Sequence, residues 1–309
     1  MGKDYLTSFS EQVDVTQINI ICVLGAGSFA QVYLVRKEEE PCAVFGTRYF
    51  TYFAMKVVSK KLIKEKDYSQ FIKLEKLLTQ KLSHPFILKL HYSFQCATKL
   101  YLVVDFEPGG TLFFHLNRHR RFTEREVRFY AAEMILALEY LHSKNILYRD
   151  LKPENVLISR SGHIKLADFG LSKSFSFDVS KNRTRRESMQ LNLERPTMEN
   201  PPLLKSKSNV DESSEKLSFD VAGTPQYMSP EMIAERGHDE LSDWWSLGIV
   251  MYELATGNPP FNHADLERLA DMICFEDLPL DSHFSADFSD LLLKLTHKVR
   301  TKRLCKSGA

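Results

Sequence analysis

The sequence offers little from which a disulfide framework or a zinc site could be built. Its 309 residues include five cysteines, an odd number, and none of them forms a C-x-x-C pair. Such frameworks need cysteines that are even in number or closely spaced, so a reducing compartment is the better expectation. We therefore expect the protein in the cytoplasm, with the nucleus as a second compartment.

Long apolar runs and an excess of one charge are also missing. No stretch approaches the roughly 20 apolar residues that span a bilayer, and the N-terminus lacks the apolar region of a signal peptide. The myristoylation pattern needs Ser or Thr at position 6, which is Leu6. The 41 basic and 40 acidic residues leave a net charge of +1. These absences predict no membrane anchor and no nucleic-acid partner.

What the chain does have is enough apolar sequence for a large core. Hydrophobic residues make up 43% and charged residues 26%, as in an ordinary globular protein. The length suits a two-lobed domain or two domains. Strand-like runs lie at 18–24, 31–35, 49–58 and 99–106. Apolar stripes with helical spacing lie at 68–82, 124–142, 244–255 and 288–295. We therefore expect a strand-rich lobe followed by a larger helical lobe.

Two glycines lie between the first two expected strands. The run consists of Leu24, Gly25, Ala26, Gly27, Ser28, Phe29, Ala30, Gln31 and Val32. Glycines let backbone N–H groups approach phosphate oxygens closely. A dinucleotide-binding loop would be followed by a helix, whereas a strand-like run follows here. The pattern favours a glycine-rich hairpin over a nucleotide, with an ordinary hairpin turn as the alternative.

A lysine on the third expected strand gains meaning from its neighbours. Side chains alternate on a strand, so Ala54 and Lys56 share one face. The small residue leaves room for a flat ring, and the ammonium group can reach phosphates. Glu75 lies on the next expected helix, where an ion pair could fix the lysine. Without such a partner, Lys56 would be a solvated edge charge.

The string YRDLKPEN at 148–155 combines a carboxylate, an ammonium group and an amide. Asp150 can accept the proton of a substrate hydroxyl, Lys152 can neutralise a moving phosphate, and Asn155 can bind Mg²⁺. Asp168 follows a strand-like run and begins the tripeptide D-F-G, and its carboxylate is a further ligand suited to Mg²⁺. A charged surface turn is the alternative for the first string, and the second motif close behind disfavours it.

In this order the motifs resemble the protein-kinase signature set. G-T-P at 223–225 and S-P-E at 229–231 complete the series. The strings SHPFILKLHYSFQ, KLYLVVDFEPGG, GHIKLADFGLSK and SDWWSLG are similar to the AGC group of serine/threonine kinases, and within it to the ribosomal-protein kinases. The resemblance extends from about residue 18 to residue 303.

The resemblance implies an α+β, two-lobed protein-kinase fold. An antiparallel sheet and one main helix would form the N-lobe at 18–106, and mostly helices the C-lobe at 107–309. Residues 1–17 would be a tail, and 175–218, rich in Ser, Asn, Lys, Arg, Glu and Pro, a disordered insert in the activation segment. By the same resemblance, we expect the family's last helix and regulatory tail to be absent after residue 303, so that either a partner supplies that tail in trans or regulation differs.

The resemblance also implies an activity with ATP and Mg²⁺ as cofactors: transfer of the γ-phosphate to Ser or Thr hydroxyls of protein substrates. The adenine would lie between Leu24, Val32, Ala54 and Leu157. The hinge and its gatekeeper would include Val104, Asp105 and Glu107. Structural support would come from Asp243 under the catalytic loop, from the Glu231–Arg303 pair, and from a stacked spine with Tyr148 and Phe169.

Regulation is expected to differ from the family pattern. The activating phosphoacceptor precedes the glycine of G-T-P by three residues, where this chain has Asp220. A carboxylate carries one negative charge and a phosphate about −1.5 to −2, so Asp220 could pair with Arg149 and Lys173 without an upstream kinase. Ser218 is a secondary candidate phosphosite. An R-x-R-x-x-S string makes Ser188 another, with a solvated charge run as the alternative.

Substrate preference should be basic. Glu154 and Glu253 match positions that receive a substrate arginine, and Thr224 is a further candidate on the substrate side. Thr111 occupies a position that is usually acidic, so a weaker demand for arginine three residues upstream is expected.

A pseudokinase or scaffold that binds nucleotide and partners with little turnover is the alternative. Ala30 replaces the third loop glycine, and Thr79 replaces a usually aliphatic residue on the helix of Glu75. Against it, the full set of expected active-site side chains is present: Lys56, Glu75, Asp150, Lys152, Asn155 and Asp168. A dinucleotide-binding enzyme is a more distant alternative, because no helix follows the glycine loop.

Overall fold

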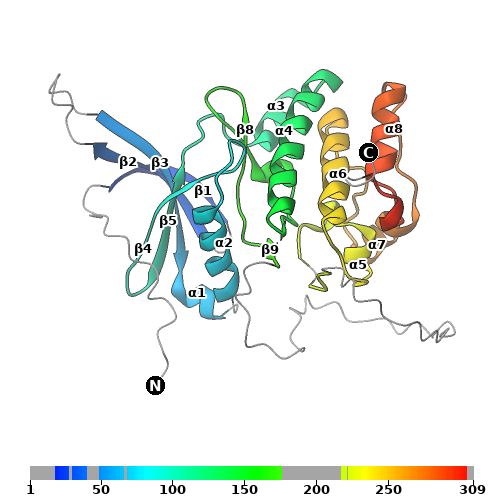
Figure 1. The fold of residues 1–309 in the computed structure, drawn as a ribbon. Helices are drawn as coiled ribbons and strands as arrows, with labels where there is room; N and C mark the ends of the chain where they lie inside the picture. Colours follow the sequence, from blue (N-terminus) through cyan, green and yellow to red (C-terminus); the bar gives the residue numbers. More distant parts are fainter. Residues whose placement is uncertain are drawn as a thin grey trace.

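The computed structural model describes residues 18–27, 30–39, 49–65, 68–175, 217–220 and 222–304. Figure 1 shows a sheet with two helices beside it at the N-terminal side, followed by a larger group of helices. This arrangement confirms the expected kinase fold, with a five-stranded antiparallel sheet and a helical C-terminal part.

The five strands of the sheet follow the order β1-β2-β3-β5-β4. They are β1 (Ile18–Ala26), β2 (Ala30–Glu39), β3 (Tyr49–Ser59), β4 (Leu90–Gln95) and β5 (Lys99–Asp105). Four shorter strands form two antiparallel pairs in the larger lobe: β6 (Ile146–Leu147) with β9 (Lys173–Ser174), and β7 (Val156–Ile158) with β8 (Ile164–Leu166). The second strand continues to Glu39, beyond the expected 31–35.

Eight α-helices are assigned in the part of the chain that the structure describes. They are α1 (Lys60–Glu65), α2 (Ser69–Lys81), α3 (Leu112–His119), α4 (Glu124–Ser143), α5 (Pro230–Ile233), α6 (Leu241–Thr256), α7 (Leu266–Phe275) and α8 (Ala286–Leu295). Short 3-10 turns lie at Pro153–Asn155, Pro225–Tyr227 and Arg300–Lys302. None of the described helices is long and apolar enough to cross a membrane.

Alternation along β3 turns Lys56 toward α2. Phe53, Met55 and Val57 pack into one apolar cluster on one side of the sheet. Val58 instead joins a second cluster, which includes Ile72 of α2. Because successive side chains of a strand point to opposite faces, Lys56 shares the face of Val58 and points toward the helix.

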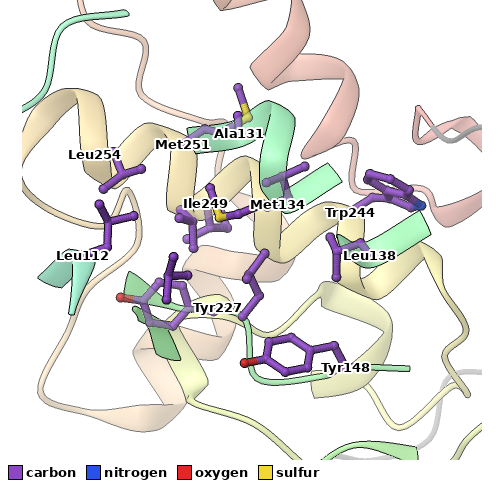
Figure 2. Close-up of a cluster of buried hydrophobic side chains, with 14 of the residues drawn as sticks. Leu112, Ala131, Met134, Leu138, Tyr148, Tyr227, Trp244, Ile249, Met251 and Leu254 are labelled. Carbon is purple, nitrogen blue, oxygen red and sulfur yellow. The ribbon is translucent and has the colours of Figure 1, made fainter. Parts of the chain in front are cut away.

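The larger lobe is built around α6. Its side chains are buried continuously from Ser242 to Ala255, and Figure 1 shows this helix between α4 and α8. Figure 2 shows residues of α4 and α6 packed in one cluster, with Tyr148 of the catalytic string at its edge. A buried central helix therefore supports the loop that carries Asp150.

Candidate active site

The expected ion pair between Lys56 and Glu75 is present. Lys56 Nζ lies 2.6 Å from Glu75 Oε1 of α2 and 3.3 Å from Asp168 Oδ1 of the D-F-G string. Burial would lower the pKa of Lys56, but the two carboxylates outweigh it and raise the pKa, so the side chain stays a cation. One ammonium group thus joins three segments of the chain.

A cavity of about 170 Å³ lies beside this cluster. Its lining consists of Gly27, Ala30, Lys56, Val58, Tyr68, Ile72 and Asp168. This volume is below the roughly 300–1,000 Å³ of pockets that hold whole small molecules, so the cavity would hold only a part of such a ligand. The Asp168 side chain is 48% exposed, which leaves its carboxylate accessible to a metal ion.

The residues present fit a phosphate-bound magnesium ion. Magnesium is usually held by one or two protein oxygen ligands together with substrate phosphates. Asp168 offers a carboxylate, and Asn155 offers its amide oxygen, because the amide nitrogen of Asn155 already donates to Asp150. In the described part of the chain, no cluster of three or more His, Cys, Asp or Glu side chains could hold a metal without such a phosphate.

Asp150 lies at the centre of a hydrogen-bond network. Lys152 Nζ is 2.9 Å from Asp150 Oδ2, and Asn155 Nδ2 donates to the same oxygen at 2.8 Å. The Thr224 hydroxyl donates to Asp150 Oδ1 at 2.9 Å and accepts from Lys152 at 2.7 Å. Lys152 Nζ also lies 3.1 Å from Asp150 Oδ1, so these contacts occupy the roughly four acceptor sites of the carboxylate. A further donor would replace one of them.

Asp243 binds the backbone of the loop that carries Asp150. Its carboxylate, on α6, accepts hydrogen bonds from the backbone N–H of Tyr148 at 2.9 Å and of Arg149 at 2.8 Å, and contacts His142 Nε2 at 2.8 Å. Arg149 and Asp168 have φ values of 67° and 54°, a conformation that costs energy in residues other than glycine. These buried bonds keep Arg149 in that conformation.

Asp220 lies between two cations of the activation segment and catalytic loop. Its Oδ2 is 2.8 Å from Lys173 Nζ and 3.8 Å from an Arg149 Nη. Burial would raise the pKa of Asp220, but Lys173 and Arg149 lower it overall. Burial lowers the pKa of Arg149 to about 10, so this guanidinium remains charged at neutral pH.

Ser218 contacts the same arginine, Arg149, from a buried position. It is buried, its hydroxyl accepts from Arg149 Nη1 at 3.2 Å, and its backbone pairs with that of His238. His238 is also buried, and its pKa is lowered to about 4 by burial and by Arg149. In this conformation the Ser218 hydroxyl is enclosed, whereas the Asp220 side chain is 61% exposed.

A comparison with known families decides what this arrangement is. The family model described as "Protein kinase domain" matches residues 18–190 and 206–308. The chain belongs to the protein kinase domain family. The resemblance to the AGC group and its ribosomal-protein kinases, which the motifs predicted, is confirmed by the relatives that the sequence matches.

Among its relatives, ribosomal protein S6 kinase alpha-6 of Homo sapiens is 39% identical to the kinase domain over 298 residues, which cover 96% of this chain and 34% of that protein. The alpha-6 protein of Danio rerio is 40% identical over 294 residues, with 95% and 34% covered. The alpha-3 protein of Mus musculus is 38% identical over 294 residues, with 95% and 34% covered. The chain spans about a third of the length of these relatives.

The kinase domain places its expected substrate-side carboxylates close together. Glu253 of α6 is buried and accepts a hydrogen bond from the Tyr227 hydroxyl at 2.7 Å. Burial, with the nearby charge of Glu154, raises the pKa of Glu253 to about 7, although the Tyr227 bond opposes this. Glu154 itself is exposed. At neutral pH the buried carboxyl is therefore partly protonated.

The residues assigned to adenine lie on four strands. Leu24 is on β1, Val32 on β2, Ala54 on β3 and Leu157 on β7. In the register of the sheet, Ala54 pairs with Val104 of β5, and Val32 pairs with Lys56. None of these four lines the cavity beside Lys56 and Asp168, so their assignment to adenine stays a prediction.

The remaining residues expected at the hinge and in the glycine loop lie as follows. Asp105 accepts hydrogen bonds from the Lys89 N–H at 3.0 Å and contacts His91 Nε2 at 2.6 Å. Glu107 follows β5 and is half-buried. Gly25, Ala26 and Gln31 lie at the ends of β1 and β2. The expected sites at Ser28, Phe29 and Ser188 lie outside the described residues, as do the tail 1–17 and most of the insert 175–218.

The supporting contacts implied by the kinase resemblance are present. Arg303 donates from two nitrogens to the Glu231 carboxylate, at 2.6 and 2.9 Å. The rings of Tyr148 and Phe169 meet edge to face with centroids 5.3 Å apart. Thr79 is buried, and its hydroxyl donates to the Glu75 carbonyl within α2 at 2.7 Å.

Two side chains near the site were missed by the sequence reasoning. Tyr68 lines the cavity beside Lys56 and Asp168, and His238 packs beside Ser218 and Arg149. Neither residue belongs to a motif. The only signal for Tyr68 is its place just before the helix that carries Glu75, which does not predict where a ring will point.

Proposed function

We propose that the kinase domain is an active serine/threonine protein kinase that uses Mg-ATP. The observation that carries this proposal is the convergence of Lys56, Glu75 and Asp168 at ion-pair distances on one side of a cavity. The Asp150 network supports it on the substrate side. Together they supply a cation for phosphate and a carboxylate for a hydroxyl.

Each side chain has one role in the proposed transfer. Bound Mg-ATP supplies the phosphoryl group and part of its charge neutralisation. The Lys56 ammonium group would bind the phosphates, while Asp168 and Asn155 would hold the metal. Asp150 accepts the hydrogen bond of the substrate Ser or Thr hydroxyl and orients it, and Lys152 neutralises charge on the transferred group. Most of the acceleration then comes from positioning and electrostatics.

Protein substrates with basic residues upstream of the acceptor fit the acidic groups nearby. Glu154 is an exposed carboxylate, and Glu253 lies close enough for its pKa to be raised by Glu154. Thr111 caps α3, where its hydroxyl accepts from the Phe114 N–H at 3.0 Å, and it offers no negative charge. We infer a preference for arginine just upstream, with a weaker demand three residues upstream.

Asp150→Asn tests the proposed function. We expect it to lower phosphate transfer from labelled ATP to a basic serine peptide by about 10²–10⁴-fold, the usual contribution of a positioned general base. Nucleotide binding should be retained, because Asp150 does not line the cavity of Lys56 and Asp168.

If the protein is instead a pseudokinase or scaffold that binds nucleotide with little turnover, the same assay should show no difference between the two proteins. Wild-type protein and Asp150→Asn would then incorporate the same trace of phosphate while binding nucleotide equally well. An array of serine and threonine peptides run alongside tests the substrate class, and a preference for acidic or proline-flanked acceptors would contradict it.

A further inference from the structure

Tyr68 lies just before α2, and its position is fixed by its neighbours. Its N–H donates to the Ile63 carbonyl at 2.8 Å, and its own carbonyl accepts from the Ile72 N–H at 3.3 Å. The ring stacks on Phe71, with centroids 4.9 Å apart and planes 21° apart. The end of α1 and the first turn of α2 thus hold the ring in place.

The Tyr68 hydroxyl shares a small space with two carboxylates beside Gly170. A Cβ added to Gly170 would lie 2.9 Å from the Tyr68 hydroxyl, 3.1 Å from Asp168 Oδ1 and 3.8 Å from Glu75 Oε2. Burial, followed by the negative charges of Asp168 and Glu75, raises the pKa of Tyr68 to about 12. A tyrosine hydroxyl is protonated at neutral pH even without this shift, so it can donate one hydrogen bond.

Glu75 has an oxygen that needs such a donor. Its Oε1 is bound to Lys56, whereas its buried Oε2 has no hydrogen-bond partner within the described part of the chain. A buried carboxylate oxygen without a donor is costly. A hydroxyl that shares its surroundings and carries a proton is suited to supply the missing bond.

We propose that Tyr68 is a positioning residue for phosphate transfer, whose hydroxyl supplies the one donor that Glu75 Oε2 lacks among the described residues and so keeps Glu75, beside Asp168, in the arrangement that Lys56 and the metal-bound phosphates require. The proposal rests on the proposed function. Tyr68 acts through the carboxylates, linking the start of α2 to the D-F-G segment. It makes no contact with the reacting hydroxyl.

Tyr68→Phe tests the role of the hydroxyl, because it keeps the ring and its stacking on Phe71. We expect kcat/KM for Mg-ATP to fall about tenfold, in line with the loss of a hydrogen bond to a charged group. The Mg²⁺ concentration for half-maximal rate should rise, since Asp168 is less well placed. Tyr92→Phe is the matched control. It removes a hydroxyl that contacts Lys37 at 3.3 Å and should leave both values unchanged.

Two readouts do not depend on turnover. Calorimetry should show weaker Mg-ADP binding to Tyr68→Phe than to wild type. Hydrogen exchange without nucleotide should be faster at 69–81 and 168–172, with an unchanged thermal midpoint. If wild-type protein transfers no phosphate, the proposed function fails, while these readouts still report on Tyr68. Unchanged Mg-ADP affinity together with unchanged exchange would overturn the proposal.

Gly170→Ala provides an independent check on the hydroxyl's place. The added methyl group would lie closest to the Tyr68 hydroxyl. Part of the loss of Mg-ADP affinity caused by Gly170→Ala should therefore disappear when Tyr68 is replaced by Phe. We expect the effects of the two changes on Mg-ADP affinity to be non-additive, as for residues in contact. Strictly additive effects would contradict the proposed position of the hydroxyl.

Discussion

At the scale of single residues, Asp220 is a carboxylate at the position where the resemblance to kinases implies a phosphoacceptor. A negative charge already lies between Lys173 and Arg149 without any phosphate. Because these cations lower the pKa of Asp220, the carboxylate is ionised at neutral pH. The stabilisation from this pairing is present above the carboxyl's unfolded-state pKa and is lost as pH falls through its lowered folded-state value.

Asp220→Asn should lower the rate of peptide phosphorylation several-fold, because Arg149 and Lys173 lose the carboxylate that lies between them. Asp220→Glu should retain more activity. The measurement is the initial rate of phosphatase-treated protein. Asp290→Asn, which breaks a surface pair with Lys294, is the control and should behave as wild type. Equal rates for Asp220→Asn and wild type would refute activation by this carboxylate.

At the scale of elements, packing between α6 and α8 depends on Gly248. An added Cβ would lie 2.7 Å from Thr296 Cγ2 and 3.0 Å from Leu295 Cβ. Contacts this short force side chains or backbone to shift. The absence of a side chain at this position is thus what lets the end of α8 approach α6.

Gly248→Ala should lower the free energy of unfolding. Overpacking costs about 1–3 kcal/mol, and the better helix propensity of Ala offsets at most about 1 kcal/mol of it. Denaturant titration measures the change. Gly25→Ala, where nothing lies within 4 Å of the added Cβ, serves as the comparison and should change stability much less. A Gly248→Ala midpoint at or above wild type would contradict this packing.

Sequence predicted the long elements well and the short ones poorly. The stripe at 124–142 became α4, Glu124–Ser143, whose start is fixed by a capping box of Thr123 and Glu126. The six residues of α1 and the eight of α3 give too few turns for a periodic pattern. The buried polar start of α6, at Ser242 and Asp243, could not be read from hydrophobicity, because its burial follows from tertiary contacts.

At the scale of the whole molecule, the site is assembled by contacts between distant segments. Lys56 and Asp168 are 112 positions apart, and Asp243 meets the backbone of Tyr148 across 95. Motif order identified these residues because the chemistry needs their side-chain types. It could not identify Tyr68, whose role depends on where the first turn of α2 docks against the D-F-G segment.

The central claim is that side chains from both lobes form one site for magnesium-bound phosphates. Titration calorimetry of ATP into the protein, with and without Mg²⁺, tests it most directly. Wild-type protein should bind ATP more tightly with Mg²⁺, and Lys56→Met should weaken that binding by about 10- to 100-fold, the loss of a charged hydrogen bond. No binding at millimolar Mg-ATP, or equal affinity in wild type and Lys56→Met, would contradict it.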